Sequence, residues 1–148
     1  MITNTLATLF TRDLTKLKTE IEAYSNESIL WDTELGISNS AGNLCLHLIG
    51  NLNGFIGSEL GNSGYKRERA LEFTLKNIPR AELIEKIDAT INIVNKVLSE
   101  LSNEQLESEY PILVFKEKTT TEFFLLHLAG HLSYHLGQIN YHRRLLDK

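Results

Sequence analysis

The sequence predicts an all-α protein, a four-helix bundle with long crossover connections. Apolar residues recur at spacings of three and four along four long segments, which is the periodicity of amphipathic helices. No segment alternates apolar and polar residues convincingly enough to indicate a sheet. The two prolines, Pro79 and Pro111, both fall between the periodic segments, where they interrupt no helix. Four amphipathic helices bury their apolar faces most simply against one another.

Size and composition are those of one globular domain covering residues 1–148. A hydrophobic content of 42% and a charged content of 23% are ordinary for a folded protein. The net charge of −4 excludes the basic surface of a nucleic-acid-binding protein. No apolar run is long enough to span a bilayer, the N-terminus lacks a signal-peptide pattern, and the sole cysteine, Cys45, rules out an internal disulfide. We therefore expect a cytoplasmic protein that binds neither nucleic acid nor membrane.

The first predicted helix covers residues 2–24. Its apolar positions follow helical spacing: Ile2, Leu6, Leu9, Phe10, Leu14, Leu17 and Ile21. The connection at residues 25–40 is rich in Ser, Asn and Gly, and we expect Trp31 and Leu35 within it to fold back onto the core. Trp31 either anchors this loop on the helices or lines a pocket.

The second predicted helix begins at residue 40 or 41 and runs to about residue 60. Its apolar face consists of Leu44, Leu48, Leu52 and Phe55, and His47 lies next to that face. Gly50, Gly54 and Gly57 each weaken a helix by roughly 1 kcal/mol relative to alanine. Something should compensate for this cost. The glycines therefore indicate either tight packing or room for a ligand beside His47.

The link at residues 61–78 carries a short basic and aromatic cluster that includes Tyr65 and Lys66. Such a run is either solvated charge or an anion clamp. In the second case Arg67 and Arg69 would bind a carboxylate-bearing substrate, because guanidinium groups form bidentate contacts.

The remaining two helices are predicted at residues 80–101 and from residues 119–121 to about 146. Pro79 lies at or just before the first turn of the third helix, which contains no histidine and is assigned to structure. Residues 110–115, YPILVF, are expected to form an extended piece over one end of the bundle. Thr119 and Glu122 match a capping box at the start of the last helix.

Four of the five histidines lie in the last predicted helix, and the first three of them are four residues apart: His127, His131, His135 and then His142. Four residues advance a helix by about 400° and 6 Å, so neighbours in this series share one face and can bind one ion. His47 is the only histidine elsewhere, so it is the natural third ligand beside His131 and His135. Three histidines would leave a fourth position for water or substrate. The competing pair is His127 with His131.

Two other residues are poorer candidates for ligands. His142 lies two turns, about 10 Å, beyond His135, so we expect it beside the site or at the surface. Cys45 projects about 160° away from His47 on the same helix.

The strings NLCLHLIGNLNGFIG, from residue 43, and HLAGHLSYHLGQINYHRR, from residue 127, resemble the DinB-like superfamily of small metal-dependent enzymes. The resemblance covers essentially the whole chain, with a histidine on the second helix and a histidine series that leads into Gly137–Gln138. It implies a four-helix bundle with crossover connections and a divalent ion held by His47, His131 and His135.

The same resemblance implies that the protein forms a homodimer, and several relatives join low-molecular-weight thiols to electrophiles. Two positions depart from the pattern of the superfamily. Leu136 stands where many members have arginine, which leaves the role of that basic group open. Gly54 stands where a bulkier residue would line the site, so the pocket is expected to be wider or the helix looser.

The leading hypothesis is a metal-dependent transferase or hydrolase acting on a small molecule, with a low-molecular-weight thiol as a candidate substrate. A metal ion lowers the pKa of a coordinated thiol or water. Gln138 would orient a ligand or the substrate, and His127 would act as a partner of the site or carry protons. No carboxylate base is evident beside the histidines, which favours thiol activation. Zinc is the first expectation, and nickel, manganese or iron fit the same ligands.

Two other hypotheses remain open. The protein is a non-catalytic helical binding or dimerisation module with a structural or vestigial metal site, or the histidines form a hydrogen-bonded core network without an ion.

Overall fold

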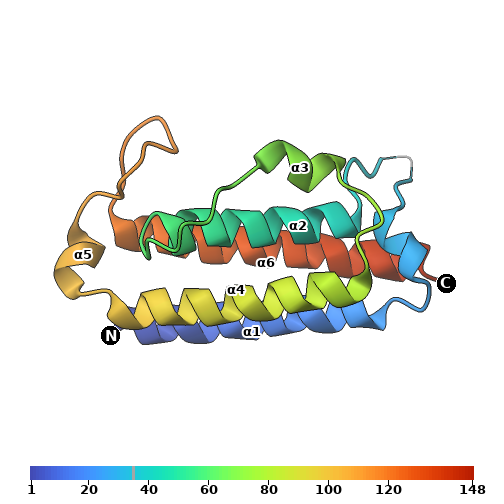
Figure 1. Ribbon diagram of the computed structural model, residues 1–148, viewed down its shortest axis with the longest axis horizontal. Helices are drawn as coiled ribbons and strands as arrows, with labels where there is room; N and C mark the ends of the chain where they lie inside the picture. The colour runs from blue at the N-terminus through green and yellow to red at the C-terminus, as the bar shows by residue number, and fades with distance from the viewer. Residues whose placement is uncertain (35) are drawn as a thin grey trace.

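The computed structural model describes residues 1–34 and 36–148, and across these residues the chain forms helices, turns and loops but no strand (Figure 1). The four long helices are α1 (Ile2–Ala23), α2 (Ala41–Leu52), α4 (Arg80–Glu100) and α6 (Thr121–Leu146). The shorter segments are η1 (Glu27–Trp31), η2 (Asn53–Ser58), α3 (Arg69–Thr74) and α5 (Asn103–Glu107). The π-helical segment η2 continues α2, so the second predicted helix is present with a change of winding. The short helices η1, α3 and α5 were not predicted, because each is too short to show a period.

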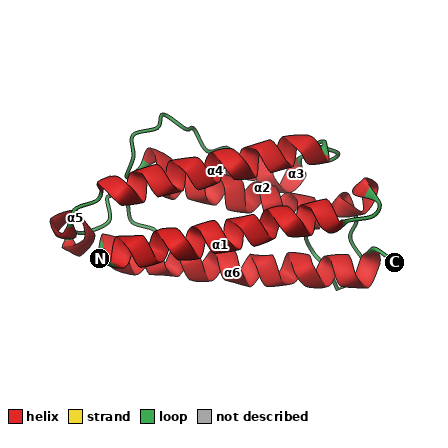
Figure 2. Cartoon of the chain, turned by 90° about the horizontal axis from the view of Figure 1, so that it is seen from below, coloured by secondary structure: helices red, strands yellow, loops and turns green. Residues whose placement is uncertain are grey.

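The four long helices lie side by side (Figures 1 and 2). Helix α1 packs beside α4 and α6, and α2 packs beside α6 and α4. In Figure 1, α1 and α6 run in one direction, whereas α2 and α4 run in the other. The links after α1 and after α4 therefore each stay at one end. The link between α2 and α4 returns along the length of the molecule and carries α3 over α2 (Figure 1).

The core lies between the four helices and is built from the predicted apolar stripes. Its fully buried members include Leu6, Phe10, Leu14, Leu48, Leu52, Ile87 and Leu125. Trp31 belongs to the same core, and its ring packs so closely on Gly42 that an added Cβ there would lie 2.7 Å from it. The interpretation of Trp31 as a loop anchor is therefore confirmed. Leu35 lies outside the described residues.

The start of α6 differs from the prediction. Thr120, rather than Thr119, caps the helix by accepting a hydrogen bond from the Phe123 amide at 3.2 Å. Thr119 precedes the cap, and its backbone carbonyl accepts a hydrogen bond from the Tyr110 amide at 2.8 Å. The capping box that begins at Thr119 is therefore wrong, since an isolated bridge between Glu109 and Thr120 places the cap one residue later.

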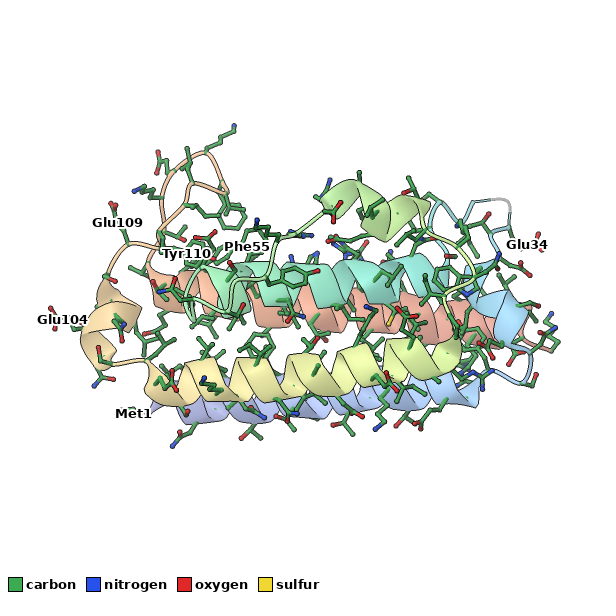
Figure 3. All side chains as sticks on the ribbon, viewed as in Figure 1. Met1, Glu34, Phe55, Glu104, Glu109 and Tyr110 are labelled. Atoms are coloured by element: carbon green, nitrogen blue, oxygen red, sulfur yellow. The ribbon has the colours of Figure 1, made fainter. Side chains whose placement is uncertain are left out.

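The segment at residues 110–119 is a loop closed by that bridge. Tyr110 is buried, and its hydroxyl donates to the Phe55 carbonyl at 2.6 Å. Figure 3 shows Tyr110 and Phe55 lying together where this loop meets η2. The side chains of Ile112, Leu113 and Val114 are exposed, so the predicted extended piece meets the helices mainly at its two ends, through Tyr110 and through the ring of Phe115, which lies 5.8 Å from that of Phe124. No helix in the described part of the chain combines the length and the apolar character of a membrane span.

Candidate metal centre

The imidazoles of three histidines from two helices converge between α2 and α6. The Nε2 atom of His131 lies 3.2 Å from Nε2 of His47 and 3.1 Å from Nε2 of His135. The ligand atoms of all three lie within 4.8 Å of one another. Nitrogens bound to one tetrahedral zinc at 2.0–2.1 Å are separated by roughly 3.3 Å. Among the described residues, these side chains form the one cluster of metal-ligating groups that is this compact.

The helices explain why these rings meet. Helices α2 and α6 are packed neighbours, and apolar residues on each, such as Leu48 and Leu128, are buried between them. His131 and His135 are one turn apart on α6, so they share one face. His47 is buried and faces this pair from α2, whereas His131 and His135 are half-buried. The centre therefore has an enclosed side at His47 and a more open side toward α6.

The hydrogen bonds of the outer nitrogens fix the tautomers of two rings. His47 Nδ1 lies 2.9 Å from Glu72 Oε1, and His135 Nδ1 lies 2.6 Å from Gln138 Oε1. Both oxygens are acceptors, so each Nδ1 carries the hydrogen and each Nε2 presents a lone pair. His131 can place at most one hydrogen on its Nε2, so at least one pair of Nε2 atoms faces each other without a proton. A cation at the centre removes this conflict.

The electrostatic environment keeps the rings on α6 in the form that binds metals. Burial, followed by the neighbouring His135 and His47, lowers the pKa of His131 to about 4. Burial also lowers the pKa of His135, although the hydrogen bond with Gln138 works in the opposite direction. Both rings are therefore neutral near pH 7, and a neutral imidazole is a metal ligand. His131 Nδ1 is buried without a hydrogen-bond partner among the described residues.

Glu72 is the functional-site residue that the sequence did not reveal. It lies 25 residues after His47, on α3, and its side chain is buried. Burial alone would raise the pKa of the Glu72 carboxyl, but hydrogen bonds from Arg67 and His47 outweigh it and the pKa is lowered. The prediction that no carboxylate lies beside the histidines is wrong. Helix α3 has only six residues, too few for a periodic signal to place Glu72 above α2.

Two glycines, Gly50 of α2 and Gly54 of η2, make room for this contact. An added Cβ at Gly50 would collide with the Glu72 carboxylate, and one at Gly54 would lie 3.2 Å from Arg67 Cδ. The tight-packing interpretation of these glycines is therefore confirmed. Of the two expectations for Gly54, the wider pocket is wrong, because the Arg67 side chain lies against this glycine. The looser helix agrees with the π-helical winding of η2, to which Gly54 belongs.

Arg67 and Arg69 differ in the contacts that their side chains make. Arg67 donates to both carboxylate oxygens of Glu72 at 2.8 Å, so its guanidinium is already engaged. Arg69 is exposed on α3 and lies over the ring of Phe73, 5.3 Å from its centroid. The Phe73 ring in turn lies 5.0 Å from the His47 ring. A role for either arginine in binding substrate stays a prediction.

The other predicted residues lie outside the cluster of three. His127 is exposed, with its ring 6.3 Å from that of His131 and 4.8 Å from that of Phe115. His131 Nε2 faces His47 and His135, so the geometry favours these over the competing pair with His127. Burial raises the pKa of the enclosed Cys45 thiol to about 12, and Cys45 does not join the cluster.

His142 is buried, and its expected place beside the site or at the surface is wrong. Its Nδ1 lies 2.8 Å from the Tyr24 hydroxyl, and its Nε2 lies 2.8 Å from the Asp32 carbonyl. Both partners belong to the chain around the end of α1 and η1, so His142 joins α6 to that end of the fold.

In protein treated with a chelator, His131 should remain neutral until the pH falls to about 4, whereas a free histidine is protonated near pH 6.5. Between these two values the unfolded chain takes up the proton first, so the free energy of unfolding should fall as the solution is acidified. An NMR titration of the His131 ring measures the midpoint. A midpoint near 6.5 would show that the ring is not enclosed as described.

Gly50→Ala should lower the free energy of unfolding by about 1–3 kcal/mol, because overpacking must displace the Glu72 carboxylate. The control is Gly130→Ala on α6, where an added Cβ meets nothing within 4 Å. That change should instead stabilise the helix by roughly 1 kcal/mol. Urea unfolding of dilute protein measures both variants, and equal stabilisation by both would contradict the close approach of Glu72.

Comparison with known proteins assigns a family to nearly the whole chain. A family model described as a protein of unknown function, DUF1572, matches residues 4–148. No curated protein matches the chain. The chain, with its histidine cluster between α2 and α6, therefore belongs to the DUF1572 family.

Proposed function

We propose that this protein is a DinB-like metal-dependent enzyme that holds a divalent ion through His47, His131 and His135. The observation that carries the proposal is the convergence of three Nε2 atoms, two of which have their Nδ1 hydrogens committed to Glu72 and Gln138. Zinc is the first candidate for three imidazoles, and nickel, manganese or iron suit the same ligands. The DinB-like affiliation draws support from the arrangement of four long helices with one link returning along their length.

The chemistry that best suits these residues is activation of a thiol for transfer to a small electrophile. A divalent ion, when bound, lowers the pKa of a coordinated thiol or water. Attack by water ordinarily needs a general base nearby. Glu72 is a poor base, because its carboxylate already accepts hydrogen bonds from Arg67 and His47. A coordinated thiol is easier to deprotonate than coordinated water, because the pKa of a free thiol is about 8.5 and that of bulk water is about 15.7. It therefore depends less on a nearby base, and we prefer thiol transfer to hydrolysis.

One aromatic side chain lies beside the histidines on each side of the site, and the two suit a small apolar substrate. The ring of Tyr134, which is mostly exposed, lies 5.2 Å from that of His135. The Phe73 ring lies 5.0 Å from that of His47. These rings offer apolar contacts without closing the site. The fully buried free Cys45 fits the reducing, cytoplasmic location that we also propose.

Protein purified without a polyhistidine tag should carry one divalent ion per chain, measured by elemental mass spectrometry. Replacement of His47, His131 or His135 by alanine should abolish binding, because two imidazoles hold the ion too weakly. His127→Ala is the matched control, since His127 lies on α6 outside the cluster, and it should bind as the wild type does. A thiol-conjugation assay with and without chelator then tests turnover. A chain that purifies without metal, and whose thermal stability is insensitive to chelator and to added ions, would contradict the proposal.

One observation favours the alternative of a dimerisation module. The outer face of α6 carries large apolar side chains that are 45–65% exposed: Phe123, Leu126, Tyr134, Tyr141 and Leu145. No charged residue occurs between Phe123 and His142. Exposed apolar surface of this extent is typical of contact sites. The face suits a second copy of the chain, and we propose a homodimer on this basis, with or without catalysis.

Leu126→Asp should convert that dimer to a monomer, because a carboxylate would be buried without a partner. Size-exclusion chromatography with light scattering measures the mass. Asn92→Asp adds the same charge on the exposed face of α4 and should leave the dimer intact. A wild-type protein that is monomeric at every concentration would refute the homodimer.

A further inference from the structure

We infer that Glu72 is the positioning residue of the metal centre. Its carboxylate, held by Arg67 above Gly50, keeps His47 in the tautomer and orientation that present Nε2 to the ion. The inference rests on the proposed metal site and assigns a role to α3 and its link, which carry none of the three histidines. By this inference His47 has a buried hydrogen-bond partner, Glu72, whereas His135 has an exposed one, Gln138.

The carboxylate of Glu72 is held on both oxygens. Arg67 Nε donates to Oε2 and Arg67 Nη2 donates to Oε1, each at 2.8 Å. This bidentate contact fixes the plane of the carboxylate. Oε1 still has a lone pair for the Nδ1 hydrogen of His47, which lies 2.9 Å away. Rotation of Glu72 away from His47 would therefore break both hydrogen bonds with Arg67.

The backbone of Glu72 is held as well. Asn43 lies one turn before His47 on α2, and its side-chain amide donates to the Glu72 carbonyl at 2.9 Å. Asn43, His47 and Gly50 share one face of α2 by their spacing, and Gly54 follows four residues later in η2. Asn43 holds the α3 backbone, His47 meets the carboxylate, and the two glycines admit Glu72 and Arg67. This face therefore fixes the position of the link between α2 and α4. Glu72 in that link in turn holds one metal ligand, His47.

The hydrogen-bond partner of His135 differs from that of His47 in its exposure to water. Gln138 accepts the Nδ1 hydrogen of His135 at 2.6 Å, but Gln138 is exposed, so water can replace its oxygen. Glu72 is only 6% exposed, so removal of its carboxylate leaves a buried N–H without a partner. Hydrogen-bond partners of metal-bound histidines typically change metal affinity by 10–100-fold. We assign an effect of this size to Glu72 and a smaller one to Gln138.

The experiment measures the zinc affinity of the full chain by competition with a chromophoric chelator. Glu72→Gln should weaken zinc binding by about 10–100-fold. A glutamine that keeps its oxygen toward His47 turns its NH₂ group against the Nε–H donor of Arg67, so it cannot keep all three hydrogen bonds of the carboxylate. Gln138→Ala should weaken binding by less than Glu72→Gln. Glu68→Gln, which removes an exposed carboxylate from the same link, should leave the affinity unchanged.

A second measurement separates positioning from a merely structural role and needs no variant. In the zinc-loaded wild type, ¹⁵N NMR of the His47 ring should show a protonated Nδ1 and a coordinated Nε2. Coordination through Nδ1 would overturn the inference, since Glu72 could not then accept its hydrogen. The unfolding transition of each variant in the presence of chelator shows whether it folds before its affinity is compared.

The two proposals fail in different ways. A wild-type chain that binds neither zinc nor nickel, manganese or iron refutes the metal site, and the role of Glu72 with it. A wild type that binds zinc and loses it in His131→Ala, but whose Glu72→Gln variant folds and binds with unchanged affinity, refutes only the role of Glu72.

Discussion

The structure depends on the enclosure of three imidazole nitrogens between two helices. Two of these nitrogens present lone pairs, because the hydrogens of their rings are held by Glu72 and Gln138. The third ring can supply one hydrogen at most, so a purely hydrogen-bonded histidine core leaves one contact unsatisfied. Buried polar atoms without partners are costly. A bound cation accepts a lone pair from all three nitrogens at once, which is why we prefer a metal site to a core network.

This enclosure explains features of the fold that are otherwise unfavourable. A helix with glycines in its interior is weaker than one with alanines, yet α2 and its continuation η2 carry Gly50 and Gly54 where Glu72 and Arg67 approach. The link between α2 and α4 returns along the length of the molecule, which takes more residues than a short turn between helices. It places α3 over α2 (Figure 1) and brings a buried carboxylate to His47. The glycines and the link therefore serve the same site.

Much of the fold was predictable because long amphipathic helices repeat their pattern many times. The stripes that contain Leu14, Leu48 and Ile87 do face the core, and Trp31 anchors its loop. The convergence of His47 with His131 and His135 follows from the same periodicity, once two helices are assumed to be neighbours. The DinB-like resemblance selected the same three residues.

The missed features depend on short or irregular segments and on contacts between residues far apart along the chain. Glu72 belongs to a helix of six residues, and nothing in its local pattern shows which face of which helix it will meet. The cap at Thr120 was misplaced because an isolated bridge with Glu109 shifts the start of α6, and long-range pairing of this kind leaves no local signal. His142 was misplaced because its partners, Tyr24 and Asp32, lie more than 100 residues away along the chain.

X-ray absorption spectroscopy of the zinc-loaded protein tests the central claim most directly, because it reports the ligands of the ion itself. The account predicts three imidazole nitrogens at about 2.0–2.1 Å, with one further light-atom ligand. A spectrum with fewer than three imidazoles, or with a sulfur ligand near 2.3 Å in protein free of added thiol, would contradict it.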